Sequence, residues 1–131
     1  MVKALALVAL LSFEHPIEAE LAKCLDKNGS TQGMVECEDQ AAKKWDAELN
    51  RVYKELMAKL KPESQKALKE SQLAWIRFRD QERLYIQALY GGFDGTMYRP
   101  MAVDACKQVI RQRAEHLQHY LEIVREHSSG N

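Results

Sequence analysis

Polar side chains interrupt the apolar stretches of this chain at helical spacing. Gln72 and Arg79 stand on the same helical face as Trp75, and Arg113 falls within a later apolar stretch. A charged side chain in a packed interior is stable only when it is paired and hydrogen-bonded. We therefore predict a polar brace inside a helical bundle, formed by Asp46, Asn50, Gln72, Arg79, Asp80 and Arg113. The alternative is that some of these groups open onto a surface groove and hold a ligand.

Groups that could perform catalysis or bind a metal are sparse. His116 and His119 stand three residues apart with Glu115 and Glu122 beside them, a spacing that could serve zinc. No second cluster supplies further ligands, so we interpret them as surface histidines and expect no metal and no cofactor. The chain also lacks a nucleophile elbow, a phosphate-binding loop and a serine near a histidine and a carboxylate. We expect a protein that is not an enzyme, although acid–base chemistry would need only two carboxylates and a pocket.

Three long amphipathic helices must position these side chains. Apolar residues recur at steps of three or four along residues 31–60, 63–90 and 100–127, which indicates one buried face on each helix. Pro62 and Pro100 suit the first turn of a helix, and Gly91-Gly92 suits the end of one. No strand pattern is present, so the sequence predicts an all-α fold, an up-down-up three-helix bundle of long antiparallel helices.

The N-terminal residues have the layout of an export signal. Lys3 precedes an apolar run from Ala4 to Phe13 that is too short to span a bilayer, and Ala19 is the small residue that a cleavage site needs. We expect residues 1–19 to be a signal peptide and residues 20–131 to be a single helical domain. The mature protein would be periplasmic or secreted and free of the membrane. A short membrane-anchoring helix is the alternative.

The charges of the chain balance, with 19 basic and 19 acidic residues. No overall field would draw the protein to nucleic acid or to anionic lipid, so we expect a protein partner and no nucleic acid. A length of 131 residues suits one domain with one core.

Three cysteines leave one over when two of them pair in an oxidising compartment. We favour a disulfide between Cys24 and Cys37, which would join an extended segment to the second turn of the first long helix. Cys106 lies among apolar residues and is expected to be a buried free thiol. Pairing of Cys106 with Cys37 or with another chain remains the alternative.

Residues 91–100 form the only long connection, with three glycines, two aromatic residues and one carboxylate. Long loops in compact helical domains tend to be either binding elements or mobile segments. This loop is therefore the expected functional element, and Phe93, Asp94 and Tyr98 are its candidate contact residues.

Four stretches of the chain together resemble the LprI-like family, small exported bacterial proteins named after a lysozyme inhibitor. They are Cys24 with residues 31–37, the pattern D-x-x-L-N-x-x-Y at residues 46–53, the pattern L-x-x-x-Q-x-A-W-I-x-x-R-D at residues 68–80, and Gly91-Gly92 with Cys106, Arg113 and Leu117. Two positions depart from the family pattern. Ile110 replaces a threonine, and Arg83 replaces a cysteine, so Cys106 lacks its usual partner and Cys24–Cys37 is favoured as the sole disulfide.

The resemblance implies a periplasmic or secreted helical protein that binds and blocks lysozyme. Lysozymes are commonly cationic, so a matched inhibitor should present a carboxylate to them. Asp94, between Phe93 and Tyr98, is the candidate for an acidic plug flanked by aromatic contacts. The alternative function is a periplasmic structural or interaction module of the cell envelope without a link to lysozyme.

Overall fold

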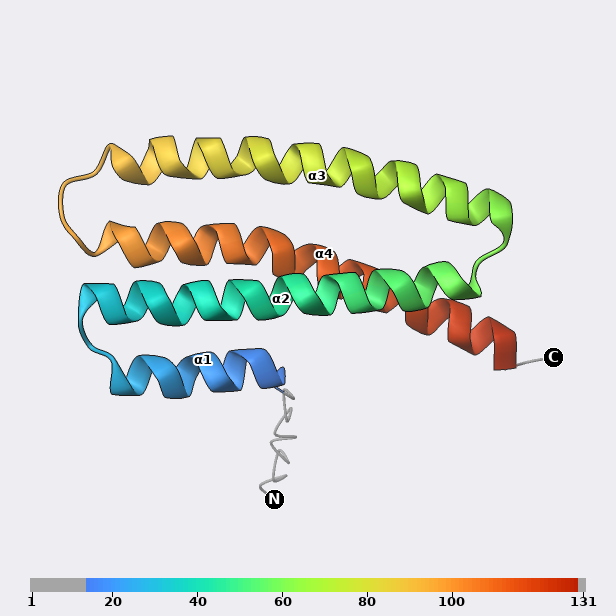
Figure 1. Ribbon diagram of the computed structural model, residues 1–131, viewed down its shortest axis with the longest axis horizontal. Coiled ribbons are helices and arrows are strands. Elements are labelled where there is room, and N and C mark those ends of the chain that lie inside the picture. The colour runs from blue at the N-terminus through green and yellow to red at the C-terminus, as the bar shows by residue number, and fades with distance from the viewer. Residues whose placement is uncertain (1–13, 130–131) are drawn as a thin grey trace, which may run out of the picture.

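The structure, a computed structural model, describes residues 14–129 as four helices joined by short connections (Figure 1). Helix α1 covers Pro16–Lys27, α2 covers Thr31–Lys59, α3 covers Pro62–Gly91 and α4 covers Tyr98–Ser129. The all-α class is confirmed, whereas the three-helix bundle is wrong because α1 is a fourth helix. Most of the predicted export signal, residues 1–13, lies outside the described residues.

Helix α1 begins where the sequence supplies both a capping group and a proline. The His15 Nδ1 atom accepts a hydrogen bond from the backbone N–H of Ile17 at 3.2 Å, and Pro16 occupies the first turn, where its missing N–H is not needed. Leu21 is buried against α2, with Ile17 packed beside it. The extended conformation expected around Cys24 is therefore wrong, because this cysteine lies within α1.

The predicted disulfide between Cys24 and Cys37 is confirmed, and it joins α1 to α2. The two Cα atoms are 5.7 Å apart, within the usual range for a disulfide. The bond lies in a small apolar cluster with Leu21 and Ala41. Cys106 is free and half-buried, and burial raises the pKa of its thiol.

Removing this disulfide should lower the free energy of unfolding by about 3 kcal/mol, because the cross-link restricts the unfolded chain. The change is Cys24→Ser together with Cys37→Ser, and urea denaturation followed by helical circular dichroism measures it. Cys106→Ser is the matched control and should cost less. An equal loss in both variants would show that the effect comes from removing a thiol and not from the cross-link.

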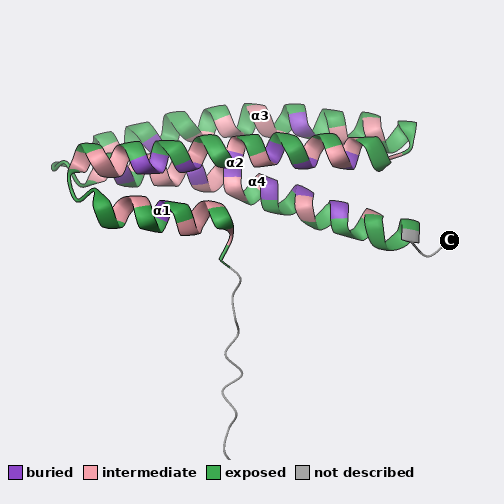
Figure 2. Cartoon of the chain, turned by 60° about the horizontal axis from the view of Figure 1, so that its bottom comes forward, coloured by how far each residue is buried: buried purple, intermediate pink, exposed green. Residues whose placement is uncertain are grey.

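The main core lies between α2 and α4. Its buried residues are Trp45, Leu49, Val52 and Leu56 from α2 and Ile110, Ala114, Leu117 and Leu121 from α4. Helix α3 lies along α4 and buries only Gln72 and Ile86, so it is the outer helix of the bundle. Figure 2 shows this difference as purple positions along α2 and α4 and a largely green α3. The loop between α3 and α4 lies at the same end of the bundle as the turn between α1 and α2 (Figure 1).

Candidate functional site

The connection between α3 and α4 is shorter than the predicted loop of residues 91–100. Gly91 is the last residue of α3 and Tyr98 is the first of α4, so the connection is residues 92–97. Gly95 has φ of 113°, a left-handed conformation that favours glycine. Gly92 has φ of −80° and ψ of −10°, a conformation open to any residue. The turn therefore depends on Gly95 and not on the Gly91-Gly92 pair.

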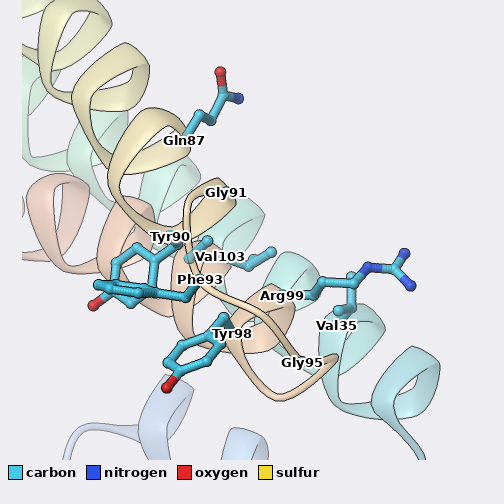
Figure 3. A pocket seen from close by; sticks show the side chains of 10 residues that line it. Val35, Gln87, Tyr90, Gly91, Phe93, Gly95, Tyr98, Arg99 and Val103 are labelled. Carbon is cyan, nitrogen blue, oxygen red and sulfur yellow. The ribbon is translucent and has the colours of Figure 1, made fainter.

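Three aromatic rings gather at this connection. The ring centroids of Phe93 and Tyr98 are 4.9 Å apart, and the Tyr90 ring lies 6.3 Å from Phe93 and 6.5 Å from Tyr98. These separations are typical of interacting aromatic pairs. In Figure 3 the rings of Tyr90, Phe93 and Tyr98 lie on one side of the loop. Phe93 is 48% exposed, so the aromatic cluster faces solvent.

A cavity of about 490 Å³ adjoins the aromatic cluster. Val35 from α2, Gln87 from α3 and Val103 from α4 contribute to its walls together with the three rings and with Gly91 and Gly95. Its volume falls within the range of roughly 300–1,000 Å³ that is usual for small-ligand sites. Because its walls come from three helices and a loop, the cavity is a product of the tertiary structure.

Two oppositely charged side chains stand beside the aromatic cluster. Among the described residues, Arg99 is the only charged one that lines the cavity, and Asp94 does not line it. Both are exposed, and neither side chain has a charged partner among residues 14–129. The loop is also tied to the start of α2, where the Thr31 hydroxyl donates a hydrogen bond to the Thr96 hydroxyl at 3.4 Å.

The residues of the predicted polar brace lie in separate places. Between α3 and α4, the Arg113 Nε atom donates a hydrogen bond to Gln72 Oε1 at 2.9 Å. A second donor of this guanidinium reaches the Ser71 hydroxyl at 3.2 Å. Burial lowers the pKa of Arg113, and the opposing effect of the nearby Tyr120 is smaller.

The other four brace residues do not join this contact. Arg79 forms an ion pair of 2.9 Å with Asp80, its neighbour on α3, and its guanidinium lies 5.5 Å from the centre of the Trp75 ring. Asp46 and Asn50 lie on α2, and Asn50 is exposed. The structure thus brings together Gln72 and Arg113 but does not assemble all six residues into one unit.

A buried lysine that the sequence analysis missed forms the main charge cluster of the bundle. The Lys107 side chain is 1% exposed, and its Nζ atom lies 2.9 Å from Glu38, 3.1 Å from Asp104 and 3.9 Å from Glu18. These contacts join α4 to both α2 and α1. The available signal was the position of Lys107 within an apolar stripe of α4.

The ionisation of this cluster follows from its burial and its pairing. Burial alone would lower the pKa of Lys107, but hydrogen bonds and charge attraction from Glu38 and Asp104 together outweigh burial, and the pKa is raised. For Glu38 the balance is reversed, because burial, together with repulsion from Asp104 and Glu18, raises its pKa more than Lys107 lowers it. The ammonium of Lys107 is therefore the firmly held charge, and it fixes where three helices meet.

Residues just before Ala19 also contact the core. The indole N–H of Trp45 donates a hydrogen bond to Glu18 Oε1 at 2.8 Å, and the His15 ring lies 4.4 Å from the Trp45 ring. On the same indole, the Arg111 guanidinium lies 5.4 Å from the ring centre, and it pairs with Glu18 at 3.4 Å. The start of α1 thereby completes the surroundings of the largest buried side chain.

The histidine pair shows no arrangement for metal binding in the described part of the chain. His116 and His119 are both exposed on α4. Among residues 14–129, no group of three or more histidine, cysteine, aspartate or glutamate side chains could hold a metal ion. Within the same residues, no helix is both long enough and apolar enough to cross a membrane.

Comparisons with known proteins identify the family of this chain. It is similar to a solved structure of an uncharacterized protein from Burkholderia thailandensis, with 28% sequence identity and a TM-score of 0.80. The similarity covers 88% of this chain and 58% of the other, so this chain spans little more than half the length of that protein. No match was found among curated proteins. A family model described as lysozyme inhibitor LprI matches residues 24–117, and because this is most of the sequence, the chain belongs to the LprI family.

Proposed function

We propose that this chain is an exported, non-enzymatic protein that inhibits a lysozyme-type muramidase through the connection between α3 and α4. Its membership of the lysozyme inhibitor family supports the inhibitor role. The observation that carries the choice of surface is the aromatic cluster of Tyr90, Phe93 and Tyr98, in which Phe93 is exposed, with the unpaired carboxylate of Asp94 beside it.

The physical properties of this surface suit a protein interface. Aromatic side chains supply much of the binding energy in such interfaces, because they bury a large area at a small cost in conformational entropy. Phe93 and Tyr98 already contact each other, so part of their ordering precedes binding. An unpaired Asp94 would gain a partner on a cationic lysozyme, which favours association and orientation.

Replacing both Asp94 and Tyr98 by alanine should weaken inhibition by roughly a hundredfold or more, since each residue is expected to be a binding hot spot. The measurement is a titration into a muramidase assay on cell-wall substrate, with several lysozyme classes and moderate salt. Circular dichroism should show unchanged helicity. A chain with Glu70→Ala and Tyr120→Ala, both exposed residues outside the loop, is the matched control. Unchanged inhibition by the first variant would remove the loop from the mechanism.

An envelope interaction module without a link to lysozyme is the second candidate. It is favoured by the apolar side chains that α3 exposes, including Leu73, Phe78, Leu84 and Tyr85. A partner that covers this helix would bury them. If the wild-type chain inhibits none of the lysozyme classes tested, this candidate replaces the inhibitor.

A further inference from the structure

Helix α3 carries a second stripe of uncharged residues on the side that faces away from the bundle. In Figures 1 and 2, α3 lies along an edge of the molecule, and the other three helices all lie on one side of it. The first stripe, which includes Leu68, Gln72 and Ile86, packs against those helices. The second stripe is exposed at every position and consists of Ser71, Ala74, Phe78, Gln81, Tyr85 and Ala88. We call it the outward stripe.

The spacing of the outward stripe is that of a coiled coil. Its successive members are three and four residues apart in alternation, which gives the average repeat of 3.5 residues that two supercoiled helices share. Helix α3 continues through the stripe without a break over its 30 residues. Charged residues lie on both sides of the stripe, but none of its six members is charged. This pattern favours contact with another helix over contact with water.

The apolar surface around the outward stripe is large enough for a protein interface. Phe78, Leu84, Tyr85 and Leu89 are each at least 40% exposed. With the alanines between them, they present on the order of 500 Å² of apolar surface, which is more than an ordinary exposed patch. A stable interface buries about 800 Å² on each partner. The stripe and its polar flanks together can supply such an area.

The residues that flank the outward stripe identify the occupant. Arg77 lies on one flank and Glu82 on the other, and neither side chain has a partner among residues 14–129. In a parallel pair of identical helices, a residue on the first flank meets the residue five positions later on the opposite flank of the other helix. Arg77 would therefore meet Glu82 of a second copy, and Leu84 would meet Leu89 of that copy. Antiparallel helices would bring Glu82 close to Glu82, so the charges select the parallel orientation.

We propose that α3 packs in parallel against α3 of a second copy of this chain and forms a two-fold symmetric dimer along the outward stripe. Phe78 and Tyr85 would each pack against their own counterparts, and the Gln81 amides would hydrogen-bond across the two-fold axis. A polar residue at one such central position fixes the register of two helices. Both loops between α3 and α4 would then lie at the same end of the dimer. The proposal does not depend on the inhibition of lysozyme.

Sedimentation velocity of the purified protein over a range of concentrations tests this dimer. We expect a dimer whose population rises with concentration, and Tyr85→Glu should weaken it at least about a hundredfold, because a charge would be buried between the helices. Tyr120→Glu, at an exposed tyrosine of α4, is the matched control and should preserve the dimer. Circular dichroism should show unchanged helicity in both variants. A monomer at every concentration, or an equal loss in both variants, would overturn the proposal and leave α3 to a partner of different sequence.

Reversal of the flanking charges tests the contact between Arg77 and Glu82. Arg77→Glu alone and Glu82→Arg alone should each weaken the dimer by about tenfold, because like charges would face each other on both sides of the axis. The chain with both changes should regain most of the wild-type affinity, since the pair re-forms with its signs exchanged. A double variant that dimerises no better than the single variants would overturn the parallel pairing.

Cysteine cross-linking measures the orientation directly. In a Cys106→Ser background, the remaining cysteines are held in the Cys24–Cys37 disulfide. Ala74→Cys alone and Ala88→Cys alone should each give a disulfide-linked dimer on oxidation, because each position faces its own counterpart. Ala47→Cys, at an exposed alanine of α2, is the control and should stay monomeric under denaturing conditions. Cross-linking that requires a mixture of the Ala74 and Ala88 variants would show antiparallel helices and overturn the proposal.

Discussion

Replacing Lys107 by methionine should lower the free energy of unfolding by about 3–5 kcal/mol, the cost of removing one partner from a buried ion pair. Methionine keeps the length of the side chain but not its charge. The Glu38 side chain, which is 10% exposed, would then lack its counter-charge. Glu18 would lose the ammonium group of Lys107 beside it. Urea denaturation followed by circular dichroism measures the loss.

The control for this prediction is Lys43→Met. Lys43 also pairs with a carboxylate, Asp39 at 2.8 Å, but its side chain is 76% exposed. An exposed pair of this kind contributes less than about 1 kcal/mol. Adding Glu38→Gln to Lys107→Met should restore part of the stability, because it removes the uncompensated carboxylate. Similar losses in the Lys43 and Lys107 variants would show that burial does not decide the effect.

Deleting residues 14–19 should destabilise the protein by at least about 3 kcal/mol relative to a chain that begins at residue 14. The deletion removes the Glu18 carboxylate, which accepts the hydrogen bond of the Trp45 indole and lies near Lys107. It also removes Ile17, which packs against both apolar clusters. Thermal and urea denaturation of the two chains provide the comparison.

The matched variant for this deletion is Glu18→Gln, which keeps a hydrogen-bond acceptor but removes the charge and should cost less than the deletion. Equal stability of the two chain lengths would show that residues 14–19 do not belong to the folded domain. If the protein is exported, cleavage after Ala19 would remove these contacts. Mass spectrometry of the exported protein would identify its first residue.

The three long helices could be predicted because each repeats an apolar stripe over many turns and has a proline or glycine near an end. Helix α1 could not, because its 12 residues are too few for a strong periodic signal and its first turn follows an apolar run that resembles an export signal. The disulfide could be predicted, although the helical conformation of Cys24 could not. Arg79 pairs with Asp80 on the same helix because α3 lies on the outside of the bundle. The apolar stripe of α3 does not reveal that outer position.

The candidate site was predictable in part. Glycines and aromatic residues in one connection indicated the loop, and Phe93 and Tyr98 of the aromatic cluster lie in that stretch, whereas Tyr90, near the end of α3, was not predicted. The cavity could not be inferred, since it depends on the approach of Val35 from α2 to a loop distant in sequence. Lys107 was missed for a different reason. Its neighbours in the stripe, Val103 and Ile110, indicate burial, but the sequence does not show that carboxylates from α1 and α2 stabilise its charge there.

The outer position of α3 also governs how the chain can fold. The two helices that share the main core, α2 and α4, are separated along the chain by the 30 residues of α3. Their contacts can form only after this long intervening segment has been closed into a loop, at a cost in chain entropy. Folding rates fall as the sequence separation of native contacts increases. This all-helical protein should therefore fold more slowly than a bundle in which successive helices build the core together.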